Sequence, residues 1–433
     1  MRASFYGAYL GPLSRLRRGL NRAGRLLLFR RRRATYYHQP DDPYGHLWLQ
    51  LLPRLIDRYP IDLRFVVVPV PSADVDPEPE LRAAFATADA RDLSNYYELD
   101  FPETNHEISA SRLRRAEAVL LVDRPIAEQL RVARTVSEAL FGGDGALLRR
   151  IVADEGSAQG QSLRPRLEQA YEELRAAGHY RGGVLRYGGE WYGNVDRLAR
   201  LEARLAAEGL DASDSILKRR ATPTFDQLPT PLPDGRFVLE VFHSFGSPFA
   251  YLATSQVQEL MQRYPLDVRI RPVIPLRTKG VRPARIKLVQ LVKDAKREAE
   301  RLGLPLGRFA RPGFAGLRRC AAVLRFAGEQ GRAIEFANAA GRAIWSEAVD
   351  VATDEGLRRV VEASGLEWEG ARTSLDRDDL DAVLEENRLA QRELGLWGFP
   401  VFKLGGYHTW GQDRLPFIEA RLEAAVKSAD AER

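Results

Sequence analysis

The 433-residue sequence predicts a mixed α/β protein built from two similar halves. The first observation is a recurring order of patterns, in which strand, helix and strand are followed by several helices, two short strands and a last helix. The second is an internal repeat of about 200 residues, the size of a domain rather than of a solenoid unit. The third is the bulk composition, with 45% hydrophobic and 29% charged residues, as in globular proteins.

The internal repeat is visible in short matching motifs. Asp42-Pro43 in the first half stands where Ser247-Pro248 stands in the second, 205 residues later. The other matches are RYPIDLR at 58–64 with RYPLDVR at 263–269, at the same offset, and DRL at 196–198 with DRL at 413–415, at an offset of 217. The rise in offset indicates a net insertion of 12 residues in the second half.

The first half is expected to form a domain at residues 35–210, after a basic extension at residues 1–34. Its apolar patterns predict strands at 34–38, 63–70, 184–187 and near Trp191, helices at 44–59 and 195–208, and mainly helices between 81 and 169. Residues 211–235 are polar and rich in proline, which is typical of a linker.

The second half, residues 236–433, is expected to repeat this order with a longer middle. The patterns predict a buried strand from Phe237, a helix at 249–263, a strand at 268–273, and helices at 285–302, 316–330, 334–349, 353–364 and 378–395. In each half a βαβ unit is thus followed by a β-hairpin and a packing helix.

The most informative stretch is VFHSFGSPFAYL at 241–252, where a strand runs into a helix. Proline is tolerated in the first helical turn, so Pro248 places Ser247 just before the helix N-terminus. Unpaired N–H groups and the helix dipole favour negative charge at that point. Ser247 is therefore compatible with two roles, an ordinary N-cap or a hydrogen-bond donor to a bound anion.

The single cysteine, Cys320, limits the chemistry of the chain. It excludes an internal disulfide and the dithiol reactions that need two cysteines. Cys320 lies in an apolar helical stretch and is expected to be a small core residue. The low cysteine content predicts a cytoplasmic location, and no apolar run is long enough to cross a bilayer.

The net charge of +6 comes from the N-terminal extension. Residues 1–33 contain ten arginines and no acidic residue, so the remainder carries about −4. The extension is compatible with weak membrane-surface contact through an amphipathic helix, with nucleic-acid binding, or with a disordered or wrongly assigned start. No specific nucleic-acid partner is expected for the two domains.

These motifs resemble one group of proteins. The motif at 241–252, Gly398-Phe399-Pro400 before a strand, and Gly411-Gln412-Asp413-Arg414-Leu415 at a helix start are together similar to 2-hydroxychromene-2-carboxylate isomerases and kappa-class glutathione transferases. The resemblance covers nearly all of residues 237–425 and, more weakly, residues 35–208. It implies two DsbA-like domains of the thioredoxin fold, each with an inserted helical subdomain.

The resemblance also implies a site for glutathione as co-substrate. Ser247 is expected to stabilise the glutathione thiolate, next to Pro248 and Phe249. The bond before Pro400 is expected to be cis, with the backbone at Phe399 pairing with the peptide-like ligand. Gln412, Asp413 and Arg414 are expected to hold the γ-glutamyl end, although Asp413 is equally suited to cap its helix.

Other residues are less clearly assigned. Lys287, with Asp294 and Arg297, fits the spacing of the resembling enzymes, although a solvated helix face explains these charges about equally well. His243 and His38 precede the two helix starts and have no partner that is readable from the sequence. We find no metal-ligand spacing and no phosphate-binding or dinucleotide motif.

The first half departs from this pattern at two positions. Asp42 replaces the serine and Gly183 replaces the proline. A carboxylate beside a thiolate would raise the thiol pKa, so the first domain is expected to be degenerate. We expect it to serve as a pseudo-subunit, which gives an intramolecular pseudo-dimer.

The resulting expectation is a glutathione-dependent isomerase or transferase that acts on a small aromatic or unsaturated substrate. The alternative is a non-catalytic binding or scaffold protein on a degenerate DsbA-like fold.

Overall fold

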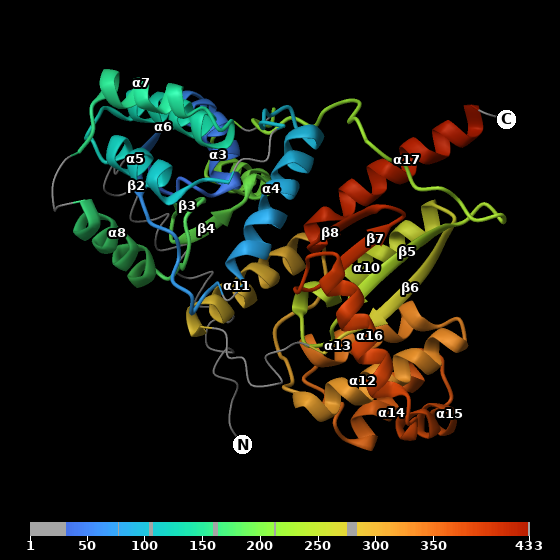
Figure 1. The fold of residues 1–433 in the computed structure, drawn as a ribbon. Helices are drawn as coiled ribbons and strands as arrows, with labels where there is room; N and C mark the ends of the chain where they lie inside the picture. The colour runs from blue at the N-terminus through green and yellow to red at the C-terminus, as the bar shows by residue number, and fades with distance from the viewer. Residues whose placement is uncertain are drawn as a thin grey trace. The chain divides into compact units, whose positions relative to one another are not determined.

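The computed structural model describes residues 32–76, 78–103, 107–158, 163–211, 214–274 and 284–431. These residues form two compact units, which are shown as ribbons in Figure 1. The N-terminal unit runs to Pro223 and also includes Ala284–Lys287, and the C-terminal unit contains the remaining described residues from Thr224 onward. The predictions for residues 1–31 lie outside the described residues.

The C-terminal unit is organised around a four-stranded sheet of order β6-β5-β7-β8. Its strands are β5 (Phe237–His243), β6 (Leu266–Pro272), β7 (Val401–Leu404) and β8 (Tyr407–Trp410). β5 and β6 are parallel and are connected by α10 (Pro248–Arg263), whereas β7 and β8 form an antiparallel hairpin. This is the predicted βαβ unit followed by a hairpin.

The last helix follows the hairpin directly. A short 3-10 turn, η4 (Gln412–Arg414), leads into α17 (Leu415–Ala431). Apolar residues of α10 and α17 pack on the sheet in one core cluster, which includes Phe237, Leu239, Leu260, Ile418 and Leu422. The sheet therefore holds the start of α10 and the turn η4 in a fixed relation.

The long insertion between β6 and β7 is helical. It comprises α11 (Arg285–Arg301), α12 (Gly313–Glu329), α13 (Ala333–Trp345), α14 (Asp354–Ala363), α15 (Trp368–Thr373), η3 (Ser374–Asp376) and α16 (Leu380–Glu393). Helices α12 to α15 gather into one compact group in Figure 1. The sequence did not predict α15, a helix of less than two full turns whose apolar pattern is too short to recognise.

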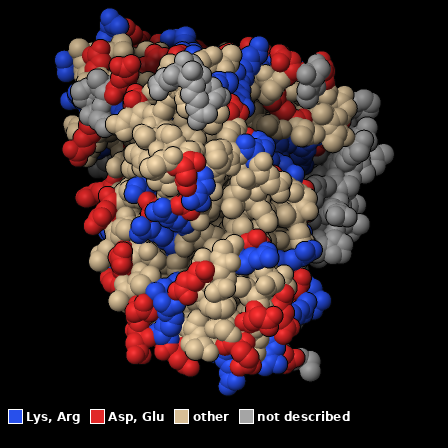
Figure 2. Space-filling model, turned by 90° about the vertical axis from the view of Figure 1, so that its right-hand side faces the viewer, with Lys and Arg blue, Asp and Glu red and all other residues tan. Residues whose placement is uncertain are grey.

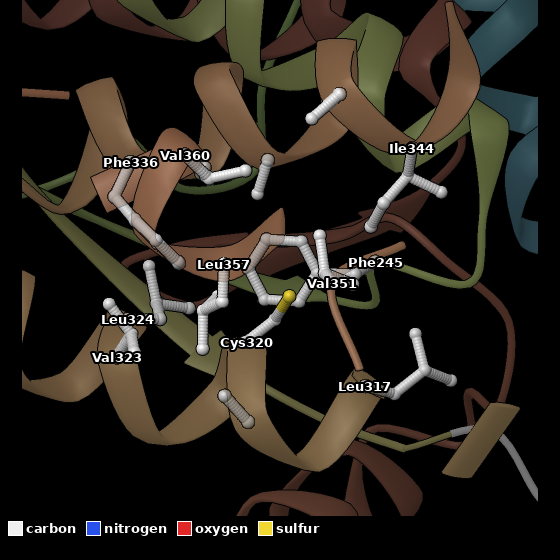
Figure 3. Close-up of a cluster of buried hydrophobic side chains, with 14 of the residues drawn as sticks. Phe245, Leu317, Cys320, Val323, Leu324, Phe336, Ile344, Val351, Leu357 and Val360 are labelled. Atoms are coloured by element: carbon white, nitrogen blue, oxygen red, sulfur yellow. The ribbon is translucent and has the colours of Figure 1, made fainter. Parts of the chain in front are cut away.

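Cys320 lies in the core of this helical insertion. Figure 3 shows its sulfur among Phe245, Leu317, Leu357 and neighbouring apolar side chains. Burial raises the pKa of the Cys320 thiol to about 12, which makes it a poor nucleophile. The prediction that Cys320 is a core residue is confirmed.

The N-terminal unit has a second four-stranded sheet, of order β2-β1-β3-β4. The strands are β1 (Arg32–His38), β2 (Ile61–Val67), β3 (Val184–Tyr187) and β4 (Glu190–Gly193). The helices are α3 (Pro43–Arg58), α4 (Pro79–Tyr96), α5 (Ala110–Leu120), α6 (Ile126–Phe141), α7 (Gly145–Glu155), α8 (Leu163–Ala177) and α9 (Leu198–Ala207), with η1 (Val195–Arg197) before α9. The order and directions of the strands match those of the other sheet.

Some element boundaries in the N-terminal unit differ from the predictions. β2 ends at Val67 rather than Val70, because Pro69 and Pro71 have no N–H to continue the ladder. β1 begins at Arg32, so the end of the expected basic extension belongs to the sheet.

The surface carries both signs of charge. On the face shown in Figure 2, Lys and Arg side chains are interspersed with Asp and Glu. Among the described residues, no helix combines the length and apolar character needed to span a membrane.

Candidate functional site

Ser247 is the N-cap residue of α10 in the C-terminal unit. Its Oγ accepts a hydrogen bond from the backbone N–H of Ala250, at 3.4 Å. The turn before it is closed by a bond from Ser247 N–H to the Ser244 carbonyl. Pro248 is buried in the first helical turn, whereas Ser247 and Phe249 are partly exposed. The capping role is thus present, and the hydroxyl still reaches the surface.

The Ser247 hydroxyl also contacts the segment before β7. Its Oγ donates to the carbonyl of Phe399, at 3.3 Å, across 152 residues of sequence. The Phe399-Pro400 peptide bond is cis, as predicted. The fold therefore brings Ser247 together with Phe399 and Pro400.

The turn η4 adjoins the same segment. The N–H of Gly411 donates to the carbonyl of Pro400, at 3.0 Å. Gly411 has a φ of +119°, and the Asp413 carboxylate folds over it, only 2.4 Å from where a Cβ would lie. Asp413 is therefore close to Pro400 in the fold, with about 20% of its side chain exposed.

Gln412 is engaged by other side chains. Its side-chain oxygen accepts from Gln256 of α10, at 2.8 Å, and its amide nitrogen donates to Glu298 of α11, at 3.4 Å. Gln412 and Glu298 are only 1% and 2% exposed. This network connects η4 with two helices and holds the turn in position.

Arg414 is also directed into the protein. The residue is 2% exposed, and its guanidinium lies over the Phe417 ring, 5.4 Å from the centroid. Its Nη1 lies 3.7 Å from a carboxylate oxygen of Asp413. Arg414 therefore orients Asp413 and offers almost no surface of its own.

Side chains of the helical insertion hold the loops around Ser247. Trp345 of α13 donates its indole N–H to the carbonyl of Phe245, at 3.1 Å. Gln391 of α16 donates to the carbonyl of Gly398, at 2.6 Å. A Cβ at Gly398 would lie 1.9 Å from the Trp410 ring, so only glycine permits this packing. The loops are thus fixed by buried contacts.

Lys287 lies at the start of α11, in a different unit from Ser247. It belongs to the N-terminal unit, where its Nζ donates to the carbonyl of Val75, at 2.8 Å. Burial lowers the pKa of the Lys287 ammonium. Farther along α11, Asp294 and Arg297 form an ion pair within the helix, at 3.6 Å.

His243 ends β5, directly before the turn at residues 244–247. It is 1% exposed, and neither ring nitrogen has a hydrogen-bond partner within the described part of the chain. Its ring packs edge-on against Phe245, with the centroids 4.7 Å apart. Burial lowers the pKa of His243 to about 3, so the imidazole is neutral at neutral pH.

In the N-terminal unit, the position that corresponds to Ser247 is occupied by Asp42. Asp42 is buried at the start of α3, and its Oδ2 lies 1.9 Å from where a Cβ at Gly183 would be. Gly183 itself has a φ of +68°. Any side chain at residue 183, including that of proline, would collide with the Asp42 carboxyl group. The two departures from the Ser and Pro pattern are thus sterically coupled.

The Asp42 carboxyl group is also electrostatically unusual. Burial raises its pKa to about 7, against the opposing effect of Arg82. The neighbouring Asp41 carboxylate raises it further. At neutral pH the group is therefore partly protonated, and it fills the space next to Gly183.

Sequence reasoning missed the residues that support the site. Glu298 and Gln391 are polar side chains buried in the C-terminal unit, and Gln256 is partly buried there. A polar residue at a core-facing helix position indicates a buried hydrogen bond, but the sequence does not identify its partner. Among the described residues, no group of three or more His, Cys, Asp or Glu side chains is arranged to hold a metal ion.

The C-terminal unit is similar to a known domain family. Residues 238–423 match the model of the DSBA-like thioredoxin domain. The C-terminal unit is thus a mixed α/β domain of the DsbA-like thioredoxin class.

The chain is also similar to particular enzymes. The chain is 26% identical over 193 residues to the 2-hydroxychromene-2-carboxylate isomerase of Pseudomonas putida, covering 43% of this chain and 94% of the relative. It is 27% identical over 192 residues to the enzyme of the same name from Sphingobium xenophagum, covering 42% and 97%. The resemblance to 2-hydroxychromene-2-carboxylate isomerases inferred from the motifs is confirmed.

A solved structure of a 2-hydroxychromene-2-carboxylate isomerase is also similar. It has 24% sequence identity to this chain and a TM-score of 0.41, and the match covers 45% of this chain and 99% of that protein.

Proposed function

We propose that the protein is a glutathione-dependent isomerase or transferase of the 2-hydroxychromene-2-carboxylate isomerase type, with its site in the C-terminal unit. The observation that carries the proposal is the Ser247 hydroxyl, which caps α10 while lying 3.3 Å from the carbonyl before cis-Pro400. The isomerase relatives, which align with less than half of the chain, support the same assignment.

The residues at the site fit the chemical groups of glutathione. Because Ser247 Oγ accepts from Ala250 N–H, its own proton remains available to turn from the Phe399 carbonyl toward a sulfur anion. The backbone at Phe399 pairs with the peptide-like part of the tripeptide. The Asp413 carboxylate attracts the ammonium group, and the helix start at η4 offers N–H groups to the carboxylate.

Glutathione supplies a nucleophilic thiolate that adds reversibly to an electron-poor carbon of an aromatic or unsaturated substrate. Ser247 and the N-terminus of α10 stabilise negative charge at the sulfur and so lower the thiol pKa. Isomerisation requires that the same sulfur leave again, so the overall reaction has no oxidant or reductant. Loss of a different group from the substrate gives a conjugate instead.

We further propose that the chain is a tandem duplication, at residues 35–210 and 236–433, joined by the linker at 211–235. The matching strand order supports this proposal. In the N-terminal copy, Asp42 occupies the space beside Gly183 and would repel a thiolate. That copy then acts as a non-catalytic pseudo-subunit. A reducing cytoplasmic location suits the single buried cysteine and the proposed co-substrate.

The proposal is tested by Ser247→Ala, with Thr353→Ala as its matched control. Thr353 caps α14 in the same way, accepting from Gly356 N–H at 3.1 Å. Each substitution should cost about 0.5–2 kcal/mol of stability through loss of a cap. Only Ser247→Ala should also weaken glutathione binding, by roughly tenfold to a hundredfold, because a hydrogen bond to a charged group is lost.

The thiolate itself provides the decisive readout. Its ultraviolet absorbance, followed against pH in the presence of the protein, should show a lowered thiol pKa with wild type and Thr353→Ala and a smaller shift with Ser247→Ala. Equal thiol pKa values for all three proteins would mean that Ser247 is only a helix cap and that the proposed function is wrong.

A further inference from the structure

The N-terminal unit contains a cavity that the proposed function does not use. It has a volume of about 410 Å³, within the range of small-molecule sites. Its walls come from α3, α4 and α6, which are labelled in Figure 1, together with the loop after α4 and Arg220. Asp42 and Gly183 do not line it, so the cavity is separate from the position that corresponds to Ser247 and Pro400.

The floor of the cavity is polar and held in place. Gln50 of α3 is 6% exposed, and its amide donates to the carbonyl of Asp100, at 2.7 Å, and accepts from the N–H of the same residue, at 2.9 Å. His46 is 3% exposed and bonds to the Ser137 hydroxyl, at 2.9 Å. These contacts fix the loop that follows α4 against α3, which gives a pre-formed site.

The floor is also uncharged. Burial lowers the pKa of His46 to about 4, with a contribution from the nearby Arg134 guanidinium. Any charge preference of the cavity at neutral pH therefore comes from its walls.

Two arginines contribute to those walls from different segments. Arg220 uses its Nε to donate to the carbonyl of Asn95, at 3.0 Å, and the structure shows no further side-chain bond for it among the described residues. Arg134 of α6 bonds to Glu138 through its Nε, at 2.9 Å. The planar guanidinium fork matches the two oxygens of a carboxylate.

The acidic residues near these arginines are open to water. The Glu138 side chain is 44% exposed and that of Asp100 is 88% exposed. Exposed acids are screened and attract or repel a ligand weakly. Arg134 is itself 47% exposed and paired with Glu138, so the partly buried Arg220 makes the stronger contribution to holding a carboxylate.

The remaining wall suits a flat apolar group. Phe101 is partly exposed, and its ring stands edge-on to His46, with centroids 5.4 Å apart. Leu99 and Pro102 add apolar surface on either side of it in the same loop. An aromatic ring would stack or pack edge-on against Phe101.

We propose that this cavity is a binding site for a small aromatic carboxylate, whose carboxylate is held by Arg134 and Arg220 and whose ring packs on Phe101. The site goes beyond the proposed function, since it uses neither Ser247 nor glutathione. It gives the N-terminal unit a ligand of its own, although Asp42 fills the position in this unit that corresponds to the proposed glutathione site.

The test is calorimetric titration of the full chain with benzoate, and with benzamide as the neutral analogue of the same shape. Benzoate should bind, and benzamide should bind at least about tenfold more weakly, because the charge-assisted bonds are lost. Arg220→Gln and Arg134→Gln should each weaken benzoate by roughly tenfold or more. Arg131→Gln is the control, since Arg131 lies on α6 but pairs with Glu155 outside the cavity.

Further measurements keep the outcomes distinct. If Arg220→Gln proves unstable, Arg220→Lys takes its place. It keeps the charge but loses the planar guanidinium, so it should also weaken benzoate binding. Ser247→Ala should leave benzoate binding at this site unchanged, whatever becomes of glutathione. Three results would each overturn the proposal: no binding of benzoate at millimolar concentration, equal binding of benzamide, or benzoate affinity that survives both arginine changes. Inorganic phosphate binding as tightly as benzoate would overturn the requirement for a ring.

Discussion

The Ser247 hydroxyl group makes two hydrogen bonds, to two segments that are far apart in the sequence. It accepts from the first turn of α10 and donates to the carbonyl of Phe399. The sequence predicted the first contact, since a Ser-Pro pair after an apolar strand is a helix-start signal. The second contact depends on which loop lies opposite and required the structure.

At Asp42 and Gly183 the structure changes the interpretation of two substitutions. From the sequence they were separate departures from a pattern, and each indicated a degenerate site. In the fold they are in contact, and the absence of a Cβ at Gly183 makes room for the Asp42 carboxyl group. Their coupling was not predictable, because the residues are separated by most of the unit's length.

We predict that Gly183→Ala destabilises the N-terminal unit more than Gly189→Ala. Both glycines have positive φ, +68° and +80°, so both variants carry a backbone cost of about 1–2 kcal/mol. A Cβ at Gly189 meets nothing within 4 Å. At Gly183 it meets the Asp42 carboxyl group, which should add about 1–3 kcal/mol of overpacking.

Urea denaturation of the two variants measures this difference. Adding Asp42→Ser to Gly183→Ala should recover most of the extra loss, because the shorter side chain removes the collision. A double variant that is no more stable than Gly183→Ala would contradict the steric coupling.

At the scale of elements, most of the fold was predictable from local patterns. Strands such as β5 and helices such as α10 have clear apolar periodicity and terminal signals. The network of Gln256, Gln412 and Glu298 was not predictable, because it joins three elements through side chains. The same holds for the cavity beside His46, which exists only once α3, α4 and α6 are packed.

Buried His243 at the end of β5 should lower the stability of the protein as the pH falls. The pKa of buried His243 is lowered to about 3, whereas in the unfolded chain it is near 6.5. Below that unfolded value the unfolded chain binds a proton that the folded chain rejects, so the contribution of His243 is complete above about pH 6.5 and is lost as the pH falls toward 3. At about pH 5 the loss should be about 2 kcal/mol.

His243→Phe should remove this acid sensitivity, since phenylalanine binds no proton. The measurement is the free energy of unfolding in urea at about pH 7.5 and about pH 5, for wild type and variant. The variant should lose about 2 kcal/mol less between the two pH values. Replacement of the exposed His408 on β8 is the control and should leave most of the wild-type pH dependence in place. An identical pH dependence in wild type and His243→Phe would contradict the assignment of a buried neutral imidazole.

For the whole molecule, the internal repeat correctly predicted two sheets of the same order. The repeat also located the two positions at which the two units differ. A Ser hydroxyl beside a cis proline in one unit corresponds to an Asp carboxyl beside a glycine in the other. Equivalent folds therefore present different chemistry, which follows from a few side chains rather than from the architecture.

This difference leads to a prediction about the number of glutathione sites. Ser247 lies at a partly exposed helix start, whereas the Asp42 carboxyl group occupies its own site and would repel a thiolate. We therefore expect one glutathione to bind per chain, in the C-terminal unit.

Isothermal titration calorimetry of the full chain with reduced glutathione tests this central claim most directly. The expected result is a stoichiometry of one per chain, with an affinity that falls by roughly tenfold or more in Ser247→Ala and is unchanged in Thr353→Ala. The absence of binding, or a stoichiometry of two that is insensitive to Ser247→Ala, would contradict the claim.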